Sequence, residues 1–197
     1  MTATTYVSRL AGSSHDENTV YAAFDNHKNE DFKPYLLKSV DAGKTWTSIA
    51  GDLPESGPVL AFAEDPVNAN LLFAGTETGV FFTIDGGRHW VRLKGGLPTI
   101  AVRDIVIQAR EGDLVIATFG RGFYVLDDIT PLRQVRDSEQ ATAAWLYRPA
   151  SAVRIDNDSF LGTPLPPEEP TAENPPNGAV IDYVLKSGAA QVKLEIL

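Results

Sequence analysis

Apolar and β-branched residues occur in short runs along most of this 197-residue chain, and turn-forming Gly, Asn and Asp residues separate the runs. Runs of this length and composition predict β-strands. Up to residue 136 the runs fall into three successive groups. We expect strands at residues 6–10, 19–24, 35–40 and 45–49, at 59–63, 71–76, 80–84 and 89–93, and at 102–108, 113–119 and 123–126.

The first two groups share an eight-residue segment that returns after 44 residues, first as Ser39–Trp46 and then as Thr83–Trp90. A repeat of this length that contains four short strands is typical of a β-propeller blade. The sequence therefore predicts an all-β fold, a partial β-propeller of about three four-stranded antiparallel blades within residues 1–136. The expected blade boundaries are residues 5–50, 51–95 and 96–136.

Each copy of the repeated segment has the composition of a tight turn. A glycine permits backbone angles that a side chain forbids, and an aspartate can accept hydrogen bonds from the amides of the turn. A hydroxyl can fasten the turn, and a tryptophan leaves it on the next strand, where its ring can cover the gap between sheets. These residues are Ser39, Asp41, Gly43 and Trp46, and Thr83, Asp85, Gly87 and Trp90. Because the aspartate recurs in each unit, we expect a structural role for it rather than a catalytic one.

The third group loses the repeated turn. Asp128 stands in the place of Asp85, but Ile129 and Thr130 replace both glycines and no tryptophan follows. Terminal repeats are often atypical, so we expect the chain to leave the repeat array at residues 131–133.

The pattern S-x-D-x-G-x-T-W resembles the Asp-box of the BNR-repeat β-propellers, a group that includes sialidases, glycoside hydrolase family 74 enzymes and sortilin-type receptor domains. Residues 18–28 and 119–128 resemble large exported bacterial members, described as sortilin-like or glycosyl-hydrolase-like. The resemblance covers about residues 5–136 and implies a parent protein that is exported to the periplasm or beyond the cell. Members of this family differ in activity.

Propellers close with about four to eight blades, so three blades leave the ring open. We therefore expect the missing propeller blades of a longer parent chain as one partner of this segment. Residues 1–10 lack a basic segment followed by an apolar one, so this chain shows no signal peptide. Such a signal is expected upstream.

Composition excludes several functions. The net charge of −9 disfavours nucleic acid as a partner, because phosphate binding needs a basic surface. The chain has no cysteine, and its three histidines lack metal-ligand spacing, so neither a metal nor a cofactor is expected. No apolar run approaches the length of a membrane span.

The chain after residue 136 has a different pattern. Residues 137–160 are expected to form a strand pair, 144–147 with 152–155, that packs on the propeller. Residues 161–177 hold a proline-rich linker, since six of the 13 prolines lie between Gly162 and Pro176. Within residues 178–197, the pattern predicts a hairpin in which strand 179–185 pairs with strand 191–197. The resemblance implies that this hairpin is the start of an incomplete immunoglobulin-like β-sandwich.

Candidate binding residues lie in the loops that face away from the two repeated turns. The ten-residue loop 25–34 is the one expansion of the repeat, and Asp25 beside His27 could form an acid–base pair there. An arginine between glycines could bind a carboxylate, and a glutamate could be one of two glycosidase carboxylates. The alternatives are an ordinary solvated loop at residues 25–34, a salt bridge from the arginine to a neighbouring loop, and a surface glutamate without a function. The candidates are Asp25, His27, Lys28, Glu77, Arg103 and Arg121.

No complete catalytic set emerges, and no catalytic residue is assigned. We expect a binding or interaction scaffold for a glycan, a peptide or a protein. The alternative is a family 74-like glycoside hydrolase whose carboxylates lie partly in missing blades, which would leave this chain alone inactive. A second alternative is an assembly factor, a role that other Asp-box propellers have.

Overall fold

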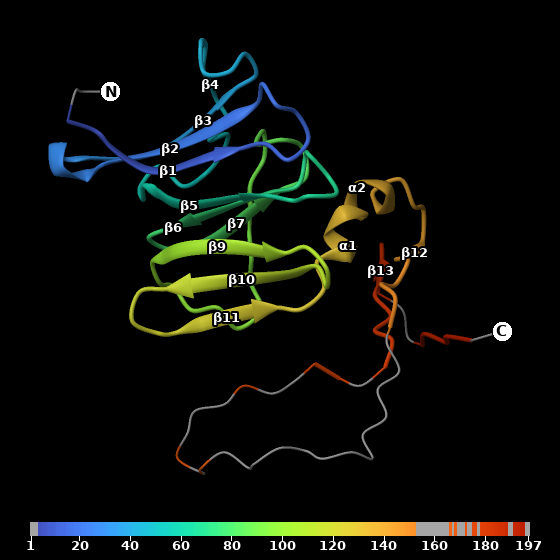
Figure 1. Ribbon diagram of the computed structural model, residues 1–197. Helices are drawn as coiled ribbons and strands as arrows, with labels where there is room; N and C mark the ends of the chain where they lie inside the picture. Colours follow the sequence, from blue (N-terminus) through green and yellow to red (C-terminus); the bar gives the residue numbers. More distant parts are fainter. Residues whose placement is uncertain are drawn as a thin grey trace. The chain divides into compact units, whose positions relative to one another are not determined.

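The computed structural model describes residues 4–152, 166, 168, 172, 175–176, 178–188 and 191–195. The chain divides after Val135 into two compact units, and each is described by itself. The first unit consists of β-sheets stacked side by side (Figure 1). This arrangement confirms the predicted all-β fold with partial propeller blades.

Three antiparallel sheets form the first unit, and in each the strands follow the order of the sequence. The innermost strands β1, β5 and β9 are neighbours, and the Arg9 guanidinium of β1 lies 3.3 Å from the Asp104 carboxylate of β9. The first sheet contains β1 (Tyr6–Gly12), β2 (Val20–Asn26), β3 (Asp31–Ser39) and β4 (Thr47–Ser48), with a short 3₁₀ turn, η1 (His27–Asn29), between β2 and β3. The second contains β5 (Val59–Glu64), β6 (Leu72–Thr76), β7 (Gly79–Thr83) and β8 (Val91–Arg92). The third contains β9 (Val102–Gln108), β10 (Asp113–Thr118) and β11 (Phe123–Leu126).

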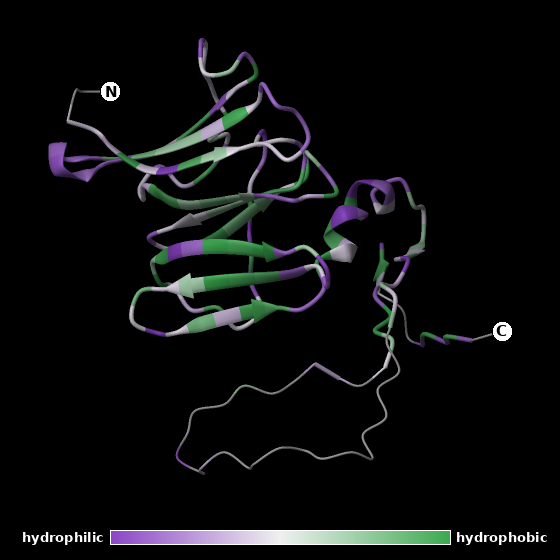
Figure 2. Ribbon diagram, in the orientation of Figure 1, coloured by the Kyte–Doolittle hydropathy of each residue, from purple (hydrophilic) through white to green (hydrophobic). Residues whose placement is uncertain are grey.

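Two apolar layers hold these sheets together. Tyr21, Leu36 and Phe62 belong to the layer between the first and second sheets, where the Tyr21 and Phe62 rings lie 4.6 Å apart. Phe73 and Ile105 belong to the layer between the second and third sheets. Each large side chain buried in this way contributes about 1.5–3 kcal/mol to folding. The second sheet is buried on both faces, and Figure 2 shows its strands and those of the third sheet as predominantly apolar.

The second and third sheets approach so closely that β6 has no room for a side chain at Gly75. A Cβ atom there would lie 2.7 Å from Cγ1 of Val102 and 3.0 Å from Cβ of Ala61. Contacts this short force a neighbour to move. The close packing of the blades therefore depends on this glycine.

Both repeated turns, which we call the first corner (residues 39–46) and the second corner (residues 83–90), are built in the same way. In the first corner, the Ser39 hydroxyl donates to Asp41 Oδ1 at 2.7 Å and accepts from the Gly43 amide at 2.9 Å. Asp41 also accepts from the amide and the hydroxyl of Thr45, at 2.8 and 2.7 Å.

The second corner repeats this network with different donors. The Thr83 hydroxyl donates to Asp85 Oδ1 at 2.7 Å, and the same oxygen accepts from the His89 amide at 3.0 Å. The imidazole Nδ1 of His89 takes the place of the Thr45 hydroxyl and lies 2.6 Å from Asp85 Oδ2. Each corner is thus closed by one hydroxyl and one carboxylate.

These contacts favour the ionised carboxylates. Hydrogen bonds from the amide and the hydroxyl of Thr45 lower the pKa of Asp41 from its usual 3.8 to about 2. Burial opposes ionisation of Asp85, but hydrogen bonds from the His89 amide and imidazole outweigh it and hold its pKa well below the usual value. The same Asp85 carboxylate raises the pKa of His89.

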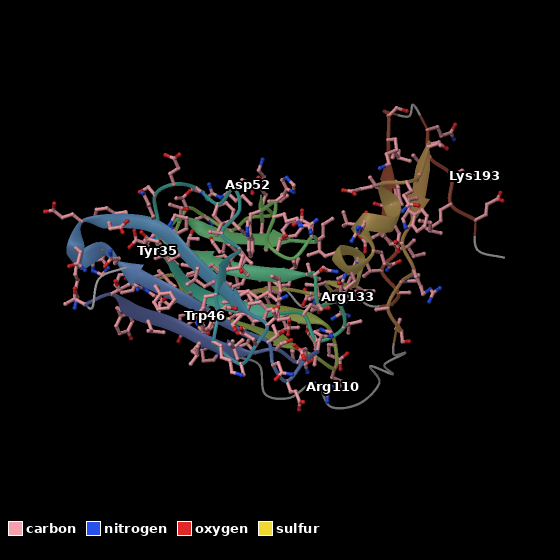
Figure 3. The ribbon with its side chains drawn as sticks, turned by 90° about the horizontal axis from the view of Figure 1, so that it is seen from above. Tyr35, Trp46, Asp52, Arg110, Arg133 and Lys193 are labelled. Atoms are coloured by element: carbon pink, nitrogen blue, oxygen red, sulfur yellow. The ribbon has the colours of Figure 1, made fainter. Side chains whose placement is uncertain are left out.

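The two corner tryptophans differ in their surroundings. Trp90 is 7% exposed, and its indole fastens it to the first blade by donating to the Ile49 carbonyl at 3.0 Å. Its amide donates at 2.6 Å to Oδ1 of Asp52, in the loop between β4 and β5. Trp46 is 38% exposed, and its indole donates to the Gly43 carbonyl of its own corner (Figure 3). The expectation that both rings cover a gap between sheets is correct for Trp90 and wrong for Trp46. Within the described residues, no further sheet lies beyond the first blade to receive Trp46.

The second unit differs from the predicted one. After α1 (Thr130–Arg133) and α2 (Val135–Ser138), strand β12 (Ala144–Leu146) pairs antiparallel with β13 (Tyr183–Leu185). The described residues therefore do not form the expected hairpin of 179–185 with 191–197, and the expected pairing of 144–147 with 152–155 stays a prediction. Residues 153–155 and 196–197 lie outside the described residues, and 191–195 form no strand. Trp145 opposite Val184 gives an aromatic and β-branched cross-strand pair, which stabilises the observed partnership. The predicted linker lies mostly outside the described residues.

We predict that Gly75→Ala lowers the free energy of unfolding by about 1–3 kcal/mol, because the new methyl group overlaps Val102 and Ala61. Urea denaturation measures this change. Gly12→Ala is the matched control, since Gly12 also lies in a strand, as the last residue of β1, and a Cβ there meets nothing within 4 Å. It should change stability by less than about 0.5 kcal/mol. Equal effects of the two substitutions would contradict the tight packing at β6.

We also predict an acid-sensitive first corner. The pKa of Asp41 is about 2 in the folded protein and 3.8 without its partners. The ionised Asp41 carboxylate therefore stabilises the folded state fully above about pH 4, and this stabilisation is lost as the pH falls towards 2. In Asp41→Asn the free energy of unfolding should therefore depend less on pH in this window, as followed by tryptophan fluorescence in urea. Asp127→Asn, at an exposed carboxylate outside the corners, should keep the wild-type pH dependence.

Candidate functional site

The candidate residues lie at one end of the blades, which we call the open end. It consists of the β2–β3, β6–β7 and β10–β11 turns and the start of β9, all at the left edge of the stacked sheets in Figure 1. Both corners follow the opposite ends of β3 and β7. Loops that project from rigid sheets in this manner commonly carry binding residues.

The first blade places Asp25 and His27 in direct contact. The imidazole Nδ1 of His27 lies 2.7 Å from both carboxylate oxygens of Asp25, and the His27 amide donates to Asp25 Oδ1 at 3.0 Å. The Asp25 side chain is 9% exposed, whereas that of His27 is 46% exposed. A nearly buried carboxylate therefore orients an exposed imidazole through its Nδ1 atom.

Beneath this pair, a network of polar side chains orders the loop. Asn26 is 4% exposed, and its side-chain amide donates to Asp31 Oδ2 at 3.0 Å, while its oxygen accepts from Asn29 at 2.6 Å. The Tyr35 hydroxyl donates to the same Asp31 oxygen at 2.7 Å. The hydrogen bonds from Tyr35 and then Asn26 lower the pKa of Asp31, and Asp31 raises the pKa of Tyr35.

The second blade contributes less to the open end. Its β6–β7 turn is only two residues long and is closed by the Thr76 hydroxyl, which donates to the Gly79 carbonyl at 3.1 Å. Glu77 is exposed at the tip of this turn, and its carboxylate makes no ion pair within the described part of the chain. It is therefore available to a ligand but is not positioned by a neighbour.

The third blade contributes two arginines and an exposed aromatic ring. Arg103 extends over the face of Phe119 at 5.2 Å from the ring centroid, although Phe119 remains 68% exposed. Arg121 lies at the tip of the β10–β11 loop between Gly120 and Gly122, whose φ angles are +83° and +71°. These left-handed positions favour glycine, and they present Arg121 to solvent.

Of the six candidates, the structure brings only Asp25 and His27 together. Lys28 is exposed beside them, and Glu77, Arg103 and Arg121 lie one or two to a blade. Sequence reasoning identified the loop but missed Asn26, Asp31 and Tyr35, which order it. The Asp31 and Tyr35 spacing of four residues on a strand could have indicated that both side chains share a face.

Neither a metal site nor a membrane span emerges from these residues. In the described part of the chain, no three His, Cys, Asp or Glu side chains are grouped so that they could hold a metal ion. No described helix is long and apolar enough to cross a membrane.

No protein-family model matches the chain, and no curated protein matches its sequence significantly. The fold, however, is similar to that of solved structures. A glycoside hydrolase family 74 enzyme from Niastella koreensis is 22% identical with a TM-score of 0.50, and the match covers 62% of this chain and 21% of that one. The family 74 xyloglucanase of Xanthomonas campestris is 18% identical with a TM-score of 0.49, and the match covers 62% of this chain and 22% of that one.

A YCF48 protein solved with a bound D1 peptide is 19% identical with a TM-score of 0.47, and the match covers 64% of this chain and 37% of that one. This chain thus spans about a fifth of the two hydrolases. At 22% identity, the match to the Niastella koreensis enzyme shows the propeller-type fold.

We predict that Tyr35→Phe raises the pKa of Asp31 towards its ordinary value, because the hydroxyl is the main group that lowers it. The side-chain carboxyl resonance of Asp31, followed by NMR during a pH titration, measures the shift. Tyr6→Phe is the control, since Tyr6 is 66% exposed on the same sheet. An unchanged Asp31 titration in Tyr35→Phe would show that the hydroxyl does not contact this carboxylate in solution.

Proposed function

We propose that this chain is part of an exported propeller of the BNR/Asp-box type, similar to the sortilin-like and family 74-type proteins, and that its open end binds a glycan or a polypeptide. The corner networks support the Asp-box assignment, because the hydroxyl, carboxylate and glycine of each copy act together in one turn. Further blades would then pack against the first blade, where Trp46 is exposed and lacks the sheet that Trp90 has.

One observation carries the binding proposal. The loop that expands the first blade is ordered by side chains, with Asn26 and Asp25 nearly buried and His27 exposed above them. Burying polar groups costs free energy unless their hydrogen bonds are satisfied. A loop that satisfies them internally has already lost most of its conformational freedom, which lowers the entropic cost of ligand binding.

Arrangement of charge at the open end favours binding over catalysis. A retaining glycosidase needs two carboxylates about 5–5.5 Å apart, and an inverting one about 6.5–9.5 Å. Asp25 is nearly buried and engaged by His27, and Glu77 stands alone at its turn. Among the described residues, no hydrogen bond or ion pair joins either carboxylate to a second carboxyl group that could share the roles of acid and base. The glycosidase alternative therefore requires residues from further blades.

We predict that His27→Ala weakens ligand binding about 10- to 100-fold, because it removes the exposed polar group that the loop positions. A glycan array and an immobilised peptide library, probed with the full chain, identify the ligand, and titration calorimetry measures its affinity. Lys44→Ala, at the exposed first corner on the opposite side, should bind as wild type. Absence of any binding in both libraries would overturn the proposal.

A hydrolysis screen on the same glycans tests the enzymatic alternative. Turnover of a β-glucan that disappears in Glu77→Gln or Asp25→Asn would replace the scaffold function with a glycosidase. Binding without release of reducing sugar would support the scaffold.

A further inference from the structure

The third blade lacks the outer strand that completes the other two. In the first blade β4 pairs with the outer side of β3, and in the second β8 pairs with that of β7. The third sheet has the order β11-β10-β9, and within the described residues no strand pairs with the outer side of β11 (Figure 1). After β11 the chain enters α1, and none of the later described strands joins this sheet.

Backbone groups of β11 face this open edge. The Thr118 amide donates to the Gly122 carbonyl at 3.1 Å, and Tyr124 is paired with Ile116 of β10. Because successive residues of a strand direct their amides and carbonyls to opposite sides, Phe123 and Val125 direct theirs away from β10. The turn and loop hydrogen bonds of the described residues provide no partner for these two residues.

The edge is short, at four residues, but within these residues it lacks the other features that usually protect an open strand. Exposed edges are commonly blocked by charged side chains, prolines or bulges. Strand β11 consists of Phe123, Tyr124, Val125 and Leu126, and its pairing with β10 is regular. Phe123 and Val125 are 76% and 55% exposed. An apolar and regular edge of this kind is suited to receive an added strand.

The complete blades show which strand fits. In both blades the outer strand begins directly after the corner tryptophan. An aliphatic residue stands three positions after that tryptophan. The amides of these residues, Ile49 and Leu93, donate to the carbonyls of Leu36 and Val80 at 2.9 Å. Leu93 and Leu97 are only partly buried beside the layer between the second and third sheets. Leu93 occupies, one repeat later, the position of Ile49, whose carbonyl accepts the indole of Trp90.

We propose that the β11 edge binds, in trans, an extended segment of a partner polypeptide with the pattern Trp-x-x-Ile or Trp-x-x-Leu. The segment adds an antiparallel fourth strand to the third blade. Its backbone pairs with Phe123 and Val125, and its tryptophan lies against Leu93. This edge site is separate from the open end and does not depend on the function proposed there.

A peptide that copies residues 88–94, with the sequence RHWVRLK, is the direct probe. Fluorescence anisotropy of the labelled peptide with the full chain should show saturable binding. Trp90→Ala in the peptide removes the ring, and Val91→Pro removes a strand amide. Each change should weaken binding at least about tenfold. Because the peptide is basic and the protein acidic, a scrambled peptide of equal charge is the control, and it should not bind.

Val125→Pro tests the edge itself. It deletes the outward amide while leaving the inward hydrogen bonds of Gly122 and Tyr124, and proline is tolerated at strand edges of this kind. We expect peptide binding at least about tenfold weaker than for wild type, whereas Val125→Thr, which retains the amide, should bind normally. Circular dichroism establishes that both variants are folded.

Hydrogen exchange on the wild-type protein gives an independent result should Val125→Pro unfold. Saturating RHWVRLK peptide should slow exchange of the Phe123 and Val125 amides more than tenfold. The proposal would be overturned if the RHWVRLK peptide did not bind, if the scrambled peptide bound equally well, or if a folded Val125→Pro variant kept its affinity. Protection from exchange that is confined to other strands would overturn it as well.

Discussion

The hydrogen bonds between a corner carboxylate and the amides that follow it are the constraint on which the first unit depends. Asp85 closes the second corner and so directs Trp90 back towards the first blade, where its indole binds Ile49 and its amide binds Asp52 in the connecting loop. One turn therefore fixes both the end of a sheet and its attachment to the preceding sheet. Between the second and third sheets, which no corner joins, the close approach at Gly75 leaves no room for a methyl group.

Rigid packing on one side of the blades allows variation on the other. The corners and apolar layers hold the strands, so the open-end loops need not contribute to the core. In the first blade this freedom is used for an ordered polar loop, with Asp25 and Asn26 below an exposed His27. The second blade has only a two-residue turn at this end, and the third blade presents Arg121 between two glycines. The loops thus present different chemistry on equivalent strands.

The repeated units are not equivalent at the margins of the array. Trp46 has the same corner as Trp90 but no neighbouring sheet among the described residues, so its indole turns to its own Gly43 carbonyl. Among the described residues the third blade has neither the corner nor an outer strand, and the β11 edge is open.

The sequence alone determined the strands of the first unit, the corners and the loss of the third corner, because turn chemistry and strand periodicity are local properties. Only the tertiary structure decided which tryptophan is buried, because burial depends on a neighbouring sheet. It also decided that β12 pairs with β13, since strands separated by almost 40 residues can pair in many ways that periodicity does not distinguish. At the open end the sequence supplied Asp25 and His27 as a pair, but Asn26, Asp31 and Tyr35 became recognisable only when folding brought their side chains into contact.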